Sequence, residues 1–252
     1  MVREMNKSSS LERNERKKNT VFPEIGKQID KVRFTHGYSR PALSKGAGIT
    51  KTQLNETVNG KLNPTPDALD RIALFLDVPS DYLLITYHED FLLYAIDDYL
   101  FRIYSDSFSA TILDILSLVG IQDGIMQSVK EQLNSFTSSI SSQNSIPDTF
   151  DWKKKIRRFR KEAGYSQATA SEALGVSYNH YVKFENEITN MSLLPHLRVC
   201  LLYGKSSESI THDKRNDMVL TKKQLDALHQ LDHRRLVTLL ETLRAIYENS
   251  NR

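Results

Sequence analysis

Two short runs of polar side chains carry the most readily interpreted chemistry in this chain. Each run follows a similar triplet, Gly48-Ile49-Thr50 in one case and Gly175-Val176-Ser177 in the other. Their ammonium, hydroxyl, amide and imidazole groups are hydrogen-bond donors and acceptors of the kind that bind the edges of bases. The residues are Lys51, Thr52, Gln53 and Asn55 after the first triplet, and Tyr178, Asn179, His180 and Lys183 after the second.

Each run lies at the start of a predicted helix. Thr50 and Ser177 are good N-cap residues, and the glycine two positions earlier can adopt the left-handed conformation that ends a preceding helix. That preceding helix begins at an N-cap serine, Ser39 or Ser166. A helix, a short turn with glycine and a second helix at a steep angle form a helix-turn-helix unit. The sequence therefore predicts two such units.

The two units belong to an internal repeat without gaps. Identical residues recur at a constant offset, as Gly48 and Gly175 do, 127 positions apart. Self-similarity of this kind is weighed before other signals, because it defines the folding unit. The other identical pairs are Ile29 and Ile156, Arg33 and Arg160, Gly37 and Gly164, Tyr38 and Tyr165, Ser39 and Ser166, Ser44 and Ser171, Asn59 and Asn186, and Asn63 and Asn190.

These residues resemble the lambda-repressor-like, or Xre, family of DNA-binding domains. The resemblance covers about half of the chain. It implies binding to double-stranded DNA and regulation of transcription, with repression by operator occupancy. The matching segments are Gly37-Tyr38-Ser39, Ala47-Gly48-Ile49-Thr50 and Asn59-Gly60-Lys61 in the first copy, and Gly164-Tyr165-Ser166-Gln167, Leu174-Gly175-Val176-Ser177 and Phe184-Glu185-Asn186 in the second.

Both copies depart from the family pattern. The first has Arg40 where the family usually has Gln, and Val58 where Glu is common. The second has Glu187 in place of a loop glycine. An acid beside the DNA backbone opposes phosphate binding, whereas Arg40 can still reach phosphate. We therefore expect the first copy to be the better DNA reader.

Other residues of the repeats are candidates for contacts with the DNA backbone. Side chains and amides at the start of the second helix meet phosphate, and residues after the third helix lie near it. The candidates at the start of the second helices are Arg40 and Gln167, and those after the third helices are Asn59, Lys61 and Asn186. Thr50 and Ser177 complete the predicted interface as caps of the third helices.

Charge is distributed along the chain in the same way. Residues 21–64 hold seven Lys and Arg against three acids, and residues 152–190 hold eight against four. Residues 65–151 hold three bases against fourteen acids. The overall net charge of +3 therefore conceals two basic modules around an acidic centre, and only the modules suit a polyanion. The alternative for the basic run 153–158 is a solvated helix face.

We divide the chain into six segments. The predicted parts are a disordered basic tail (1–20), a first helix-turn-helix domain (21–85), an acidic helical spacer (86–140), a linker (141–150), a second helix-turn-helix domain (151–210) and a C-terminal helical segment (219–249). The tail could enter a minor groove or hang free. The spacer could be a core, a dimer interface or a regulator pocket. The leucine stripe between Leu236 and Tyr247 could pack on the second copy or self-associate across a dyad.

Several other classes of protein are disfavoured. No run of about 18 apolar residues is present and the N-terminus is polar, so we expect a cytoplasmic protein with no membrane partner. The DNA binding that the resemblance implies would place it at the nucleoid. The single cysteine, Cys200, excludes disulfides and Cys-based zinc sites within one chain and fits a buried thiol. The segment Gly46–Thr50 lacks the Gly-Lys-Ser/Thr ending of a phosphate loop. The helical pair His229 and His233 lacks a third ligand, so we expect no metal site there. With these motifs set aside, we expect no cofactor and no enzyme activity.

The sequence thus predicts an all-α protein with two lambda-repressor-like helix-turn-helix domains, a helical spacer and a C-terminal association helix. The function expected from it is sequence-specific binding of double-stranded DNA as a homodimer, with repression of transcription. The alternative is a protein-interaction module, antitoxin-like or antirepressor-binding, in which only one repeat contacts DNA. The two hypotheses differ in whether both third helices present polar side chains to solvent.

Overall fold

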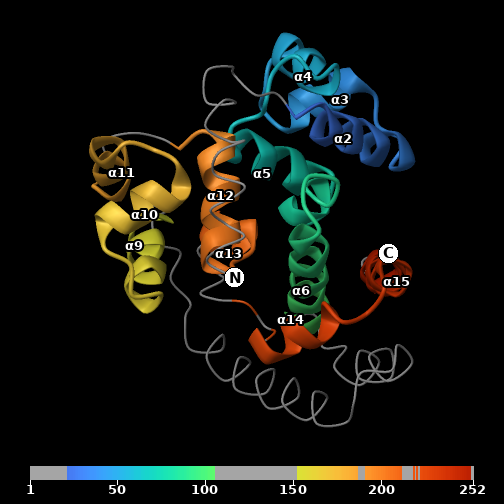
Figure 1. Ribbon diagram of the computed structural model, residues 1–252. Coiled ribbons are helices and arrows are strands. Elements are labelled where there is room, and N and C mark those ends of the chain that lie inside the picture. The colour runs from blue at the N-terminus through green and yellow to red at the C-terminus, as the bar shows by residue number, and fades with distance from the viewer. Residues whose placement is uncertain are drawn as a thin grey trace.

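The computed structural model describes residues 22–105, 152–186, 191–211, 218, 220 and 222–250. These residues form helices and turns, with no strand among them. Figure 1 shows one group of short helices for each repeat, with α5 and α12 between the two groups and longer helices below. The predicted all-α fold with two helix-turn-helix domains is confirmed.

The first domain contains four α-helices and a 3-10 helix. Its helix-turn-helix unit is formed by the second and third helices, which are short and capped by hydroxyl side chains. The elements are α2 (Pro23–Thr35), α3 (Arg40–Gly46), α4 (Lys51–Val58), α5 (Pro66–Phe75) and η1 (Ser80–Leu83).

The second domain repeats this order. Its last four helices begin at the residues that the repeat offset of 127 predicts, as Gln167 does relative to Arg40. The repeat therefore extends beyond the identical residues, into a segment where the sequence shows little similarity. The elements are α9 (Trp152–Glu162), α10 (Gln167–Leu174), α11 (Tyr178–Glu185), α12 (Leu193–Tyr203) and α13 (Ser207–Thr211).

The predicted turn between the second and third helices is present in both domains. Gly48 and Gly175 have φ values of 61° and 68°, in the left-handed region that favours glycine. Thr50 Oγ1 accepts a hydrogen bond from the amide of Gln53, and Ser177 Oγ accepts one from the amide of His180. Local capping therefore sets where each third helix begins.

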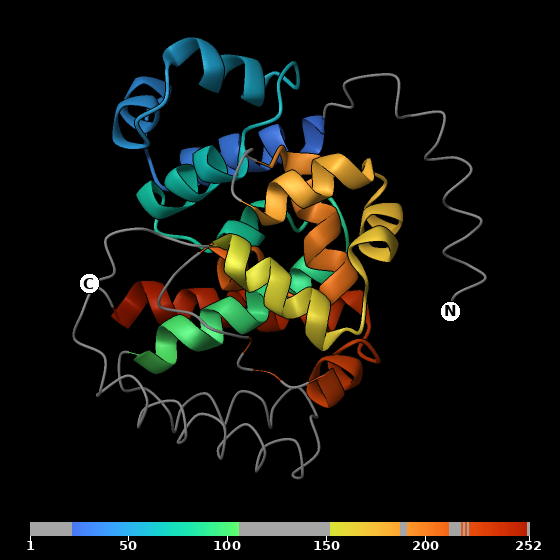
Figure 2. The same cartoon turned by 90° about the vertical axis from the view of Figure 1, so that its left-hand side faces the viewer.

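The remaining helices form a layer away from the third helices. They are α6 (Asp90–Ser105), α14 (Lys222–Leu228) and α15 (His233–Ser250). Figure 1 and Figure 2 both show these helices below α2, α3 and α4 of the first domain. The predicted apolar stripe of α6 is buried, with Phe91, Ala95 and Tyr99 fully enclosed.

The leucine stripe of α15 is buried mainly against α6, a partner that the sequence did not suggest. Leu239, Leu240 and Leu243 are buried, and α15 packs extensively along α6. Tyr82 of η1 donates a hydrogen bond to Glu241, and Tyr247 donates one to Asp77. These apolar side chains are therefore already covered within the same chain, so the self-association predicted from the sequence would need another surface of the protein.

Three further sequence predictions concern the rest of the chain. The tail 1–20, the spacer beyond residue 105 and the linker 141–150 lie outside the described residues. Cys200 is buried as expected, and burial raises the pKa of its thiol well above the usual range. Across the part of the chain that the structure describes, each helix is too short or too polar to cross a membrane.

Candidate nucleic-acid interface

The predicted base-reading residues are exposed in both domains. All of them are exposed: Lys51, Thr52, Gln53 and Asn55 on α4, and Tyr178, Asn179, His180 and Lys183 on α11. The opposite faces of these helices are buried, through Leu54 on α4 and Phe184 on α11. Neither third helix is packed away, which is the arrangement expected of two reading surfaces.

Two of these side chains are held in place by their own helix. The amide of Thr50 donates to Gln53 Oε1 at 3.0 Å while Gln53 donates its own amide to Thr50 Oγ1 at 3.1 Å, a complete capping box. The capping box uses the Oε1 atom of the Gln53 side chain as an acceptor. The other end of this exposed side chain, Nε2, can donate a hydrogen bond. On α11, the ring of His180 lies 4.3 Å from that of Phe184. Both side chains are therefore partly pre-positioned before any ligand binds.

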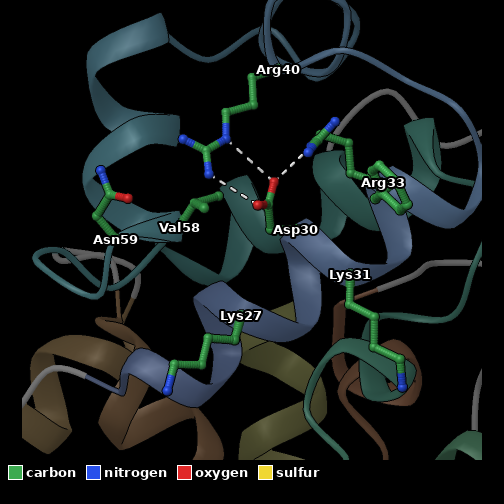
Figure 3. Close-up of a pocket in the computed structure, with 8 residues that line it drawn as sticks. Lys27, Asp30, Lys31, Arg33, Arg40, Val58 and Asn59 are labelled. Atoms are coloured by element: carbon green, nitrogen blue, oxygen red, sulfur yellow. Dashed lines mark hydrogen bonds and ion pairs between the residues drawn. The ribbon is translucent and has the colours of Figure 1, made fainter.

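In the first domain, one carboxylate holds two arginines near the end of α4 (Figure 3). Asp30 of α2 accepts a hydrogen bond from Arg40 Nη2 at 2.9 Å and another from Arg33 Nε at 2.7 Å. The hydrogen bond from Arg40 lowers the pKa of Asp30 most and outweighs the opposing effect of burial. An open hollow of about 360 Å³ lies here, lined also by Lys27 and Lys31. Its cationic lining suits a phosphate group.

In the second domain, the corresponding carboxylate comes from the third helix. The Glu185 side chain is 0% exposed and receives Arg160 through both of its oxygens, at 2.6 and 3.1 Å. Gln167 Nε2 donates to it at 2.7 Å and the Tyr181 hydroxyl at 2.9 Å. Burial raises the pKa of Glu185, but these hydrogen bonds, led by that of Arg160, bring it below its ordinary value.

These two clusters explain the departures of the first copy from the family pattern. Val58 occupies the position that Glu185 has in the second copy, and its apolar side chain cannot pair with an arginine. The missing carboxylate is supplied by Asp30, which occupies the position of Arg157. Arg40 then replaces Gln167 because its partner has moved from the third helix to the first. The two changes compensate each other. Sequence reasoning noted Arg40 and Val58 separately and missed Asp30, although comparison of the copies at that position would have revealed the exchange.

The predicted backbone-contact residues have different freedom in the structure. Asn59 and Lys61 are exposed directly after α4. The side chain of Arg40 is 38% exposed despite its bond to Asp30, so a face of the guanidinium remains open. Asn186 is exposed too, but its Oδ1 accepts from Arg157 Nη2 at 2.9 Å. Glu187 lies outside the described residues.

The basic run of α9 is partly used within the domain. Arg157 Nη2 also donates to the carbonyl of Glu185 at 2.8 Å, and Lys155 Nζ donates to the carbonyl of Ser209 at 3.2 Å. Lys154 and Lys161 are exposed. Some basic side chains of this run therefore stabilise the domain itself, in addition to any contribution to binding a polyanion.

The two domains meet through η1 and α13, which sequence reasoning did not foresee. Asp81 Oδ1 accepts from the amide of Ser207 at 3.0 Å, and its Oδ2 accepts from the amide of Glu208 at 3.3 Å. In return, Glu208 Oε1 accepts from the amide of Ser80 at 3.3 Å. Ser80 and Asp81 correspond to Ser207 and Glu208 in the repeat, so equivalent residues face each other.

This contact is buried and braced by neighbouring helices. Arg102 of α6 donates to Glu208 at 2.6 Å, and Ser80 donates to Asp70 of α5 at 2.6 Å. Burial raises the pKa of Asp81 to about 6 and that of Asp70 to about 7. The interface therefore holds several carboxyl groups that are supported by amide, hydroxyl and guanidinium donors.

A serine and a histidine inside the same contact resemble a nucleophile and its base. His196 Nε2 lies 2.8 Å from Ser207 Oγ, and burial lowers the pKa of His196 to about 4. His196 is only 2% exposed and Ser207 is fully buried, so no substrate can reach them. The pair joins α12 to α13 within the second domain.

Of the two histidines considered as metal ligands, His229 instead pairs with a carboxylate. His229 Nε2 lies 3.2 Å from Asp90 Oδ1, at the junction of α14 and α6. In the described ranges, His, Cys, Asp and Glu side chains form no group of three suited to a metal ion.

Comparison with known proteins agrees with the geometry. A family model described as helix-turn-helix matches residues 32–83 and 156–194. The first match runs from within α2 to the end of η1, and the second from within α9 to the start of α12. No curated protein and no solved structure matches the chain.

Proposed function

Because the chain carries two tandem helix-turn-helix domains of the Xre, or lambda-repressor-like, type and is thus a DNA-binding regulator, we propose that it binds specific operators and represses transcription by occupying them. The observation that supports this most directly is the exposure of the polar face on both third helices. Residues at the N-terminal end of such a helix contact base edges in the major groove. The family resemblance supports the repressing sign of the regulation.

The main alternative is a protein-interaction module in which one repeat docks a partner instead of DNA. Both α4 and α11 retain an N-terminal cap, exposed polar side chains and an adjacent cluster of arginines. These shared features favour two DNA readers. Selection of binding sites from random duplexes by the full chain tests the proposal. We expect an enriched sequence with two elements, whereas a single enriched element would favour the alternative.

The expected partners and location belong to this proposal. A homodimer would need a surface other than the leucine stripe of α15, which is covered by α6. Two chains would then place two bipartite elements next to each other. A regulator site in the spacer stays a prediction for residues beyond 105, and we place the protein at the nucleoid in the cytoplasm.

Base readout is expected to depend on Gln53 in the first domain and on Asn179 in the second. Replacing either by alanine should relax the preference at one or two base pairs, at a cost on the order of 1 to 3 kcal/mol for each base pair that is no longer bound by the side chain. The change is measured as relative affinity for operators with single base substitutions. Asn249→Ala, which removes an exposed amide from α15, is the matched control. Unchanged base preference in both variants would contradict the assignment.

Backbone anchoring is expected to depend on Lys61, which is exposed directly after α4. Lys61→Ala should weaken specific and random duplexes to a similar degree and lower the slope of log affinity against log salt by about one unit. Lys223→Ala, an exposed lysine on α14, should leave the slope unchanged. A Lys61 variant with altered base preference and an unaltered slope would show that this residue does not bind phosphate.

A further inference from the structure

The contact between η1 and α13 has the form of a twofold interface. From it we infer that a single chain reads two unequal half-sites in inverted orientation, and so takes the place of a homodimer. This inference rests on the proposed function. It concerns how the two half-sites are arranged and how many chains occupy them.

The reciprocal hydrogen bonds are the first support. Asp81 binds the amides of Ser207 and Glu208, and Glu208 binds the amide of Ser80. In a twofold interface, residue i of one copy contacts residue j of the other and j contacts i in return. A head-to-tail arrangement would instead join two different surfaces. The pattern seen here, between residues that correspond in the repeat, identifies an approximate twofold rotation.

The backbone of the two copies supports the same equivalence. Asp77 and Gly204, the residues that correspond just after α5 and α12, have positive φ values of 54° and 61°. The chain then enters η1 in one copy and α13 in the other. In each domain this short helix also contacts the first helix, as η1 does with α2 and α13 with α9. The two surfaces that meet are therefore built in the same way.

The position of the third helices follows from this rotation. Figure 1 shows α4 at the top and α11 at the upper left, one on each side of the α5 and α12 pair. The layer of α6, α14 and α15 lies below both in Figure 1 and Figure 2. Two helices related by a twofold rotation read half-sites of opposite orientation, whereas a translation would be needed for direct repeats.

The two half-sites cannot be equal in sequence. At corresponding positions, Lys51, Thr52 and Gln53 are replaced by Tyr178, Asn179 and His180. An ammonium, a hydroxyl and an amide offer other hydrogen bonds than a phenol, an amide and an imidazole. We therefore expect an operator with two inverted half-sites of different sequence. A homodimer with one head per chain would instead favour two equal half-sites.

The spacing of the half-sites is fixed by the braces of the interface. Arg102 of α6 holds Glu208, and Tyr82 of η1 is bonded to Glu241 of α15. These bonds join the contact between the domains to the α6 and α15 layer. We expect half-site centres about one helical turn apart, about 34 to 36 Å, or a multiple of it.

The test uses the full chain and the operator selected from random duplexes. Four probes are compared: the selected site, the same site with one element reversed, the site with 5 bp (about half a helical turn) inserted, and each element alone. Affinity is measured at fixed salt, and the mass of the complex gives the number of chains. Gln53→Ala and Asn179→Ala identify which element each domain reads.

We expect inverted, unequal elements occupied by one chain. Reversing one element or inserting half a turn should weaken binding by about 100-fold, the order of the gain from tethering two heads. Each variant should relax the preference in one element only. Preference for direct repeats, tolerance of the half-turn insertion, or two chains on one pair of elements would overturn the inference and leave the proposed function intact. A selection that enriches no sequence would overturn both.

Discussion

Replacement of Glu185 by alanine is expected to lower the free energy of unfolding by about 3 to 5 kcal/mol, the usual cost of removing one partner from a buried ion pair. The side chain of Glu185 is 0% exposed and receives hydrogen bonds from Arg160, Gln167 and Tyr181. Without it, these three donors lose their common acceptor on α11. Urea unfolding followed by the fluorescence of Trp152, the only tryptophan, measures the change.

The contribution of Glu185 to the free energy of unfolding should also depend on pH, which gives a second test. The folded pKa of Glu185 is lowered, so the native state binds fewer protons than the unfolded state as pH falls. Its contribution to stability is present above the ordinary value of 4.5 and is lost as pH falls through the lower folded value. The variant should lack this loss. Glu172→Ala, at an exposed glutamate of α10, is the control and should stay within about 0.5 kcal/mol of the natural chain. Equal stability of the two variants would refute the structural role of the Glu185 cluster.

Replacement of Asp81 by alanine is expected to weaken the contact between the domains. The amides of Ser207 and Glu208 both lose their acceptor. An unsatisfied buried donor costs about 1 to 3 kcal/mol, so two such groups should cost about 2 to 6 kcal/mol. Removing a buried charged carboxylate would by itself stabilise the fold and offset this cost. Below the raised pKa of Asp81 the side chain is largely protonated, so this offset is small and the lost hydrogen bonds dominate. Thermal and urea unfolding near pH 5 measure the difference.

The effect of Asp81→Ala should change with pH in a defined direction. Burial raises the folded pKa of Asp81 from 3.8 to about 6, so the native state binds more protons than the unfolded state between these values. Its stabilising contribution is complete below pH 3.8 and declines as pH rises through about 6. The deficit of the variant should therefore shrink over this window. Asp226→Ala, at an exposed aspartate of α14, should show no such trend. A deficit that grows with pH would contradict this account of the interface.

The two repeats and their helices were predictable because their signals are local. An N-cap bond joins residues three apart, as in Thr50 and Gln53, and a left-handed glycine such as Gly48 acts within its own turn. The periodic apolar faces predicted the buried sides of the helices, and with them the exposed polar faces of α4 and α11. The helix-turn-helix identity and the exposure of both polar faces thus follow from contacts of short sequence separation.

The sequence by itself therefore determined the helices, the repeat and which faces are buried, but not what covers them. Burial of apolar surface is non-directional, so the stripe of α15 required a partner without specifying α6. Hydrogen bonds between distant residues leave no periodic trace: Asp81 and Ser207 are 126 positions apart. Comparison of the copies shows Asp30 at the position of Arg157 and Val58 at that of Glu185. That Asp30 then binds Arg40 is visible only once α2 and α3 are packed together. Only the tertiary structure decided these pairings, because they depend on which surfaces the chain brings together in space.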